Sequence, residues 1–113
     1  MAFQRALALD DLWDGDMTGA VVAGQRVLLI RLDGEVHAYE DRCAHLGVAL
    51  SGGQLVGDVV ICRAHQYEYD ARTGAGVNPR NVCLVRFPVR ISDGQIYVDV
   101  DAAQPAAARR ACQ

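Results

Sequence analysis

The sequence lacks any long apolar run, and no segment approaches the roughly eighteen consecutive apolar residues that cross a bilayer. It also lacks an excess of positive charge, because 11 basic residues stand against 14 acidic ones and leave a formal charge of −3. Nucleic-acid binding requires a clustered basic surface. The N-terminal segment has neither the long apolar core nor the small-residue cleavage site of a secretory signal. The composition therefore predicts a cytoplasmic protein that binds neither nucleic acid nor membrane.

Helical patterns are scarce as well. Asp10 or Asp11 could begin a single turn, but no longer segment carries a helical period. A chain of 113 residues forms one domain with one modest core. We place this domain in residues 1–101. The alanine-rich tail of residues 102–113 has no core-forming pattern, and we expect it to be mobile.

The sequence does contain short apolar segments separated by turn residues, which is the pattern of an all-β protein. Asp33-Gly34 and Ser92-Asp93-Gly94 are hairpin signals, because glycine accepts the positive φ of tight turns. Pro88 interrupts a predicted strand and cannot donate a backbone hydrogen bond, so we expect that strand to lie at a sheet edge or to carry a bulge. The expected strands are residues 27–32, 35–39, 59–62, 66–69, 84–91 and 95–100.

The central part of the chain contains two pairs of metal-ligating residues in loop-like surroundings. They are Cys43-Ala44-His45 and Cys62-Arg63-Ala64-His65, with sixteen residues between His45 and Cys62. A Rieske-type [2Fe–2S] cluster needs two cysteines on one iron and two histidines on the other. Each pair supplies one ligand of each kind, so two loops can hold the cluster between them. We therefore predict one [2Fe–2S] cluster bound by Cys43, His45, Cys62 and His65.

A zinc site is the competing interpretation, since Zn²⁺ accepts two cysteines and two histidines in a tetrahedron. Zinc fingers usually pair like with like at helix-compatible spacing, whereas these pairs are mixed and no helix follows. The mixed pairs favour the cluster. The other cysteines have no partner at ligand spacing; we expect Cys83 to be a small buried residue and Cys112 a free thiol in the tail.

The sequence resembles the Rieske family over residues 1 to about 100, and within it the ferredoxin component of toluene-type multicomponent monooxygenases. The resemblance implies three antiparallel sheets, with a loop-rich cluster-binding subdomain at about residues 40–82 inserted in a β base domain. It also implies a monomeric electron carrier rather than an enzyme. Its donor would be an NADH-dependent flavin reductase, and its acceptor the diiron hydroxylase of an aromatic or alkene monooxygenase. The segments that carry the resemblance are Leu9-Asp10-Asp11-Leu12-Trp13, Cys62-Arg63-Ala64-His65, Thr73-Gly74-Ala75-Gly76-Val77-Asn78-Pro79 and Phe87-Pro88-Val89.

Two other functions remain open at this point. A ferredoxin of a ring-hydroxylating dioxygenase would have the same cluster and a Rieske oxygenase as its acceptor. A small subunit of nitrite reductase would relay electrons inside a larger enzyme, and it would co-purify with a sirohaem protein.

The resemblance also bears on the reduction potential. High-potential Rieske proteins carry a disulfide at the positions of Val48 and Ala64 and a serine at the position of Tyr67, so these departures predict a potential at the low end of the range. Tyr69 resembles the tyrosine that donates to a cysteine ligand in high-potential members. We hypothesise that its hydroxyl raises the potential, and simple packing of the ring is the alternative.

The remaining candidates have structural or electrostatic interpretations. We expect His37 to be a structural histidine, Arg63 to be solvated, and Gly52 and Gly53 to serve tight turns. Pro79 could stiffen a third loop over the cluster. Four acidic residues flank the ligand loops and could steer a basic partner surface, with ordinary solvated charge as the alternative. These four are Glu40, Asp41, Glu68 and Asp70.

Overall fold

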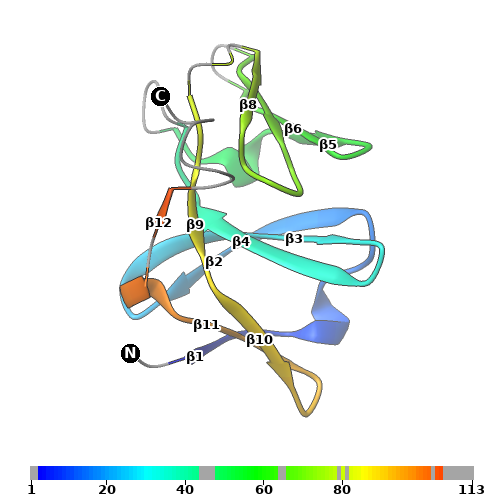
Figure 1. Ribbon diagram of the computed structural model, residues 1–113. Helices are drawn as coiled ribbons and strands as arrows, with labels where there is room; N and C mark the ends of the chain where they lie inside the picture. Colours follow the sequence, from blue (N-terminus) through cyan, green and yellow to red (C-terminus); the bar gives the residue numbers. More distant parts are fainter. Residues whose placement is uncertain are drawn as a thin grey trace.

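The structure is a computed structural model, which describes residues 3–43, 48–63, 66–78, 80, 82–102 and 104–105. Three antiparallel sheets are stacked along the molecule (Figure 1). The first contains β1 (Gln4–Ala8), β11 (Gln95–Val98) and β10 (Val89–Ser92), in that order. The second runs β12 (Gln104–Pro105), β9 (Val85–Phe87), β4 (Glu35–Glu40), β3 (Gln25–Leu32) and β2 (Asp16–Val22). The third contains β5 (Gln54–Val56), β6 (Val59–Ile61), β7 (Glu68–Asp70) and β8 (Gly76–Asn78).

Helical structure in the described residues is confined to three short 3₁₀ turns. They are η1 (Leu9–Asp11), η2 (Leu50–Gly52) and η3 (Val100–Ala102). None of the helices in the described part of the chain is long and apolar enough to cross a membrane. The all-β prediction is confirmed.

Two hairpins, one in the second sheet and one in the first, follow directly from their turn residues. Asp33 and Gly34 adopt φ values of 52° and 80° between β3 and β4, and Asp93 and Gly94 adopt 53° and 72° between β10 and β11. Two consecutive residues with positive φ form the turn whose twist matches paired antiparallel strands. Both predicted hairpins are therefore present.

Pro88 divides one predicted strand between two sheets. We expected residues 84–91 to form a single strand at an edge or with a bulge, but β9 and β10 belong to the second and first sheets. Proline has no N–H with which to continue the ladder, while its carbonyl accepts a hydrogen bond from the Asp99 N–H at 3.2 Å. The chain therefore changes sheets at the proline.

The central sheet carries a hydrophobic core on each face, because side chains alternate along β3. Leu28 and Ile30 lie in the core that also contains residues of the third sheet, whereas Val27 and Leu29 lie in the core shared with the first sheet. Burial of all four is complete. The third sheet is thus attached to the rest of the molecule through the core that contains both Cys43 and Cys62, the two cysteines predicted as ligands.

Two polar contacts reinforce this attachment. The Tyr39 hydroxyl in β4 donates a buried hydrogen bond of 2.9 Å to the carbonyl oxygen of Ala71, just after β7. The neighbouring Arg72 pairs with Asp33 in the β3–β4 turn and lies 3.7 Å from Asp58. Tyr39 thus links β4 of the second sheet to the end of β7, and Asp33 links the β3–β4 turn to the same segment of the third sheet.

Several elements escaped the sequence analysis. The expected strands did not include β1, β2, β5 or β8. Residues 104–105 pair with β9 in the segment for which we expected no fixed structure. Short or exposed strands such as β5 and β8 have too few alternating residues to carry a period.

Candidate metal centre

The first ligand loop begins where β4 ends. Cys43 is buried, and its N–H donates to the carbonyl oxygen of Val48 at 2.8 Å, which closes the loop. Asp41 is also buried, and its carboxylate accepts hydrogen bonds from the Ser51 N–H at 2.8 Å and the Ser51 hydroxyl at 2.7 Å. These two bonds hold Ser51, which follows the loop, against Asp41, which lies two positions before Cys43.

Gly19 in β2 leaves space for this pair of hydrogen bonds. A Cβ at Gly19 would lie 2.9 Å from both the Asp41 Oδ2 and the Ser51 Oγ atoms, closer than such contacts occur. A side chain at position 19 would therefore displace the hydrogen-bonded pair of Asp41 and Ser51. Sequence analysis missed this role, since nothing near Gly19 in the chain indicates the distant loop.

The second ligand loop follows β6 directly. Cys62 is completely buried; its N–H donates to the carbonyl oxygen of Tyr67 at 2.8 Å, and its own carbonyl accepts from the Gln66 N–H at 2.9 Å. Gln66 has a φ of 61°, the left-handed region that a non-glycine residue rarely adopts. The tight turn thus returns the chain from Cys62 into β7.

Gly53 allows the two loops to approach one another. Gly53 closes a tight turn as expected, because its N–H donates to the carbonyl oxygen of Leu50 at 2.9 Å, but its φ of −91° does not itself require a glycine. A Cβ at this position would instead overlap the carbonyl oxygen of Ile61, the residue before Cys62. Because Gly53 has no side chain, the end of the first loop can pack against β6, which directly precedes Cys62.

The structure brings the two predicted cysteine ligands into one core, although 18 positions separate them in the chain. Both are thiols rather than halves of a disulfide. The Tyr69 hydroxyl lies 3.4 Å from the Cys43 Sγ, and both residues are buried. A pair of buried cysteines with a hydroxyl donor beside one of them suits an iron–sulfur cluster, whose thiolates accept hydrogen bonds. His45, His65 and Pro79 lie outside the described residues.

The acidic residues near the loops differ from one another in their surroundings. Asp41 is buried against Ser51, so it cannot act as an exposed steering charge. Asp70 accepts hydrogen bonds from the backbone N–H groups of Arg72 and Thr73, and so it stabilises a turn. Of the four that we proposed for steering, the half-buried Glu40 and Glu68 have no ion pair within the described part of the chain.

His37 and Cys83, two other residues for which we expected structural roles, differ in their exposure. His37 is buried, as expected of a structural residue, yet neither of its ring nitrogens has a hydrogen-bond partner in the described part of the chain. Burial lowers its pKa, Arg86 lowers it further, and Glu35 opposes the shift. Cys83 is half-buried rather than fully buried. Cys112 lies outside the described residues.

The chain is similar to known ferredoxins over most of its length. It is 41% identical over 95 residues to the ferredoxin component of the alkene monooxygenase system of Xanthobacter autotrophicus, covering 83% of this chain and 78% of the relative. It is 31% identical over 97 residues to the ferredoxin component of naphthalene 1,2-dioxygenase from Pseudomonas putida, covering 85% and 93%.

Solved structures agree with these relatives. The ferredoxin of carbazole 1,9a-dioxygenase from Nocardioides aromaticivorans superimposes with a TM-score of 0.79 at 27% identity, covering 87% of this chain and 97% of that one. A chain from a complex of reduced oxygenase and oxidised ferredoxin in carbazole 1,9a-dioxygenase has a TM-score of 0.76 at 30% identity, covering 85% and 91%. Residues 2–88 match the family described as the Rieske [2Fe–2S] domain. The chain therefore belongs to the Rieske [2Fe–2S] family, has the Rieske fold, and is a ferredoxin of the multicomponent oxygenase type with one Rieske-type cluster.

Proposed function

We propose that this ferredoxin carries electrons one at a time from an NADH-dependent flavin reductase to the diiron hydroxylase of an aromatic or alkene monooxygenase. The observation that carries this choice of system is the 41% identity to the ferredoxin component of an alkene monooxygenase system. The protein then acts as a cytoplasmic, monomeric component rather than as an enzyme, because the oxygenation belongs to its acceptor.

Cys43, His45, Cys62 and His65 are the proposed ligands. The burial of Cys43 and Cys62 in one core supports the cysteine pair, and each histidine follows its cysteine within three residues. The bound cluster supplies a one-electron couple. The chain contributes the hydrogen bonds that hold both loops, a hydroxyl at the Cys43 sulfur, and an apolar core that excludes water from the cysteine side.

A dioxygenase role is the second candidate, and a specific similarity supports it. Ferredoxin components of naphthalene 1,2-dioxygenase systems are about 31% identical to this chain. In that role the donor would be similar, but the acceptor would be a Rieske oxygenase instead of a diiron protein.

An EPR-monitored redox titration is the first test of the cluster. We expect a rhombic signal on reduction and a midpoint near −150 mV, the low end of the Rieske range. A strongly positive midpoint would contradict the role in an NADH-driven monooxygenase. No signal from folded and fully metallated protein would indicate zinc and would contradict the assignment of a [2Fe–2S] cluster to these ligands.

The choice of acceptor requires a second measurement. Reduced ferredoxin is mixed in a stopped-flow instrument with a purified diiron hydroxylase from an alkene monooxygenase, and separately with a naphthalene dioxygenase oxygenase. We expect faster oxidation by the diiron protein. Faster oxidation by the Rieske oxygenase would favour the dioxygenase role instead.

A further inference from the structure

A surface pocket lies beside the second predicted ligand loop, and Arg63 is the only charged residue among the described residues that line it. The pocket has a volume of about 280 Å³, and the described residues that line it include Cys62, Arg63, Gln54 and Gln66. Both glutamines are exposed and offer amide N–H donors. The described part of the lining therefore combines one guanidinium and two amide groups with no carboxylate.

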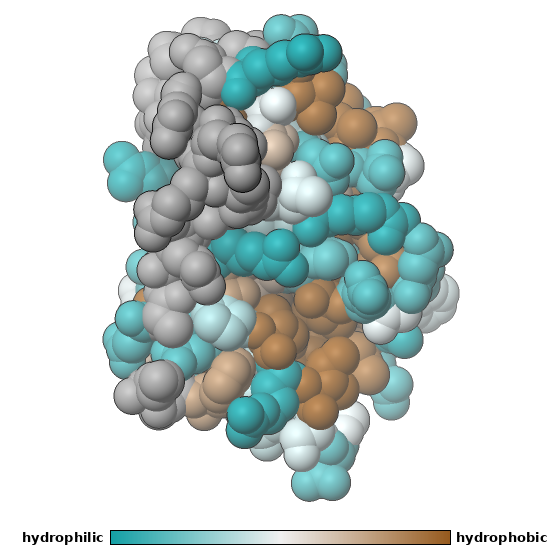
Figure 2. All heavy atoms as spheres, viewed as in Figure 1, coloured by the Kyte–Doolittle hydropathy of each residue, from teal (hydrophilic) through white to brown (hydrophobic). Residues whose placement is uncertain are grey.

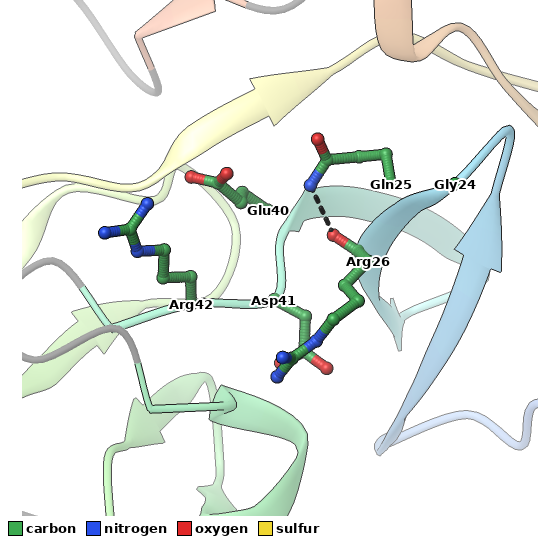
Figure 3. A pocket seen from close by; sticks show the side chains of 6 residues that line it. All are labelled: Gly24, Gln25, Arg26, Glu40, Asp41 and Arg42. Atoms are coloured by element: carbon green, nitrogen blue, oxygen red, sulfur yellow. Dashed lines mark hydrogen bonds between the residues drawn. The ribbon is translucent and has the colours of Figure 1, made fainter.

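Other pockets lined by described residues have mixed charge. The pocket of about 200 Å³ between β3 and β4 contains Arg26 and Arg42, but Glu40 and Asp41 line it too (Figure 3). A neighbouring pocket contains Arg42 together with Glu40. The viewed face likewise shows hydrophilic and apolar residues interspersed over its described part (Figure 2). Among the described lining residues, the pocket at Arg63 thus differs from these pockets in having a cation without a balancing anion.

The aliphatic stem of Arg63 passes beside the first loop. Its Cδ atom lies 3.4 Å from the place that a Cβ on Gly52 would occupy, so the aliphatic stem lies against η2. The residue is nevertheless exposed, and no carboxylate in the described residues lies within ion-pair distance of it. An exposed arginine whose guanidinium has no carboxylate partner among the described residues is suited to bind a carboxylate through paired hydrogen bonds.

We propose that this pocket is a docking point for an acidic side chain on the protein that exchanges electrons with the cluster. Its location supports this use, since the pocket contains a proposed cluster ligand, Cys62, and a partner carboxylate held there would bring the partner's surface to the ligand loop. Its charge is also opposite to that of the whole chain, which carries −3. A local cation on an acidic protein favours one docking site over the remaining surface. The proposal rests on the proposed electron-carrier function.

A chemical footprint tests the carboxylate site without requiring electron transfer. The sequence contains no lysine, so arginine residues are its charged side-chain targets for phenylglyoxal, and mass spectrometry can measure each of them. We expect 10 mM citrate, used as the carboxylate probe, to slow modification of Arg63 by roughly 3-fold. Arg26 is the matched control, because two carboxylates share its pocket, and its modification rate is expected to be unchanged. Equal protection of both residues, or of neither, would overturn the proposal.

Electron transfer to charged probes gives the second readout. Reduced protein gives one electron to ferricyanide, which becomes ferrocyanide, and no proton is transferred. We expect Arg63→Gln to slow this reaction by roughly 5-fold at low salt, with the difference disappearing at high salt. Hexaamminecobalt(III), a cation of equal and opposite charge, should not be slowed. Arg63→Lys should retain most of the rate, and Arg26→Gln should be unaffected.

The outcomes separate this inference from the proposed function. Equal slowing of both oxidants by Arg63→Gln would indicate a changed cluster and would overturn the docking role. A native protein without a Rieske EPR signal would overturn the proposed function, and the docking role with it, while the footprint would still report whether Arg63 binds carboxylates.

Discussion

The Tyr69 hydroxyl lies 3.4 Å from the Cys43 sulfur in the buried core between the second and third sheets. A cluster-bound cysteine is a thiolate and can only accept, so with Cys43 as a proposed ligand the Tyr69 hydroxyl would be the donor. Donation to a cluster sulfur stabilises the reduced, more negative state and raises the potential. The geometry favours the hydrogen-bonding hypothesis for Tyr69 over simple packing.

Tyr69→Phe should therefore lower the midpoint potential by on the order of 50 mV, because about 1 kcal/mol of differential stabilisation corresponds to about 40 mV for one electron. The measurement is an EPR-monitored titration of both proteins at one pH. An unchanged midpoint in a variant with a normal EPR spectrum would contradict the hypothesis.

Tyr39→Phe is the matched control and a prediction in its own right. Tyr39 is equally buried, but its hydroxyl donates to the Ala71 carbonyl oxygen rather than to a sulfur. The substitution leaves that carbonyl without this donor, so we expect a loss of about 1–2 kcal/mol in stability and no change in potential. Thermal unfolding followed by circular dichroism should show a midpoint lower by roughly 5 °C. A shifted potential here would mean that ring substitutions alter the cluster indirectly.

Gly53→Ala should disrupt the contact between the two ligand loops. The new methyl group would overlap the Ile61 carbonyl oxygen, a backbone atom that cannot move without displacing Cys62. We expect a loss of about 3 kcal/mol or more, together with a reduced iron content. Gly52→Ala is the control, since its methyl group would meet only the flexible Arg63 stem at 3.4 Å. Similar iron content in both variants, measured by absorbance and iron assay, would contradict the role assigned to Gly53.

Ser51→Ala should loosen the first ligand loop. It removes the hydroxyl hydrogen bond to the buried Asp41 carboxylate but keeps the backbone one. The expected cost is about 1–2 kcal/mol, since a buried carboxylate loses one of its donors. The half-life of the cluster in mild urea, followed by visible absorbance, should shorten severalfold. A half-life equal to that of the native protein would show that the hydroxyl does not restrain the loop.

His37 predicts a pH dependence of stability. Burial lowers its pKa from the ordinary value of 6.5, with Arg86 and Arg72 acting in the same direction and Glu35 and Asp70 opposing them. Below about pH 6.5, His37 therefore binds a proton more readily in the unfolded chain than in the folded protein. The free energy of unfolding falls as the pH drops below about 6.5 and is regained as the pH rises through that value.

His37→Phe should remove this part of the pH dependence. It should also leave stability at pH 8 unchanged or slightly higher, because a buried ring without hydrogen-bond partners is replaced by an apolar one. Thermal unfolding midpoints of both proteins between pH 5 and pH 8 provide the comparison. Parallel curves across this range would contradict the lowered pKa.

The sequence by itself determined the features that depend on neighbouring residues. The mixed pairs of Cys and His predicted the cluster that family membership confirms, and the Asp-Gly pairs predicted the hairpins that the structure contains. Ligand type and backbone φ preference are properties of a residue and its immediate neighbours, which explains why they could be recognised without a fold.

Only the tertiary structure decided which distant residues meet. Gly19 and Gly53 each have a positional role because a segment from elsewhere in the chain lies where their side chain would be. The same holds for the burial of Asp41, which removed it from the steering charges, and for Pro88, whose two flanking strands joined different sheets. Close approach and burial arise from the packing of segments far apart in sequence, and local residue patterns contain no record of that packing.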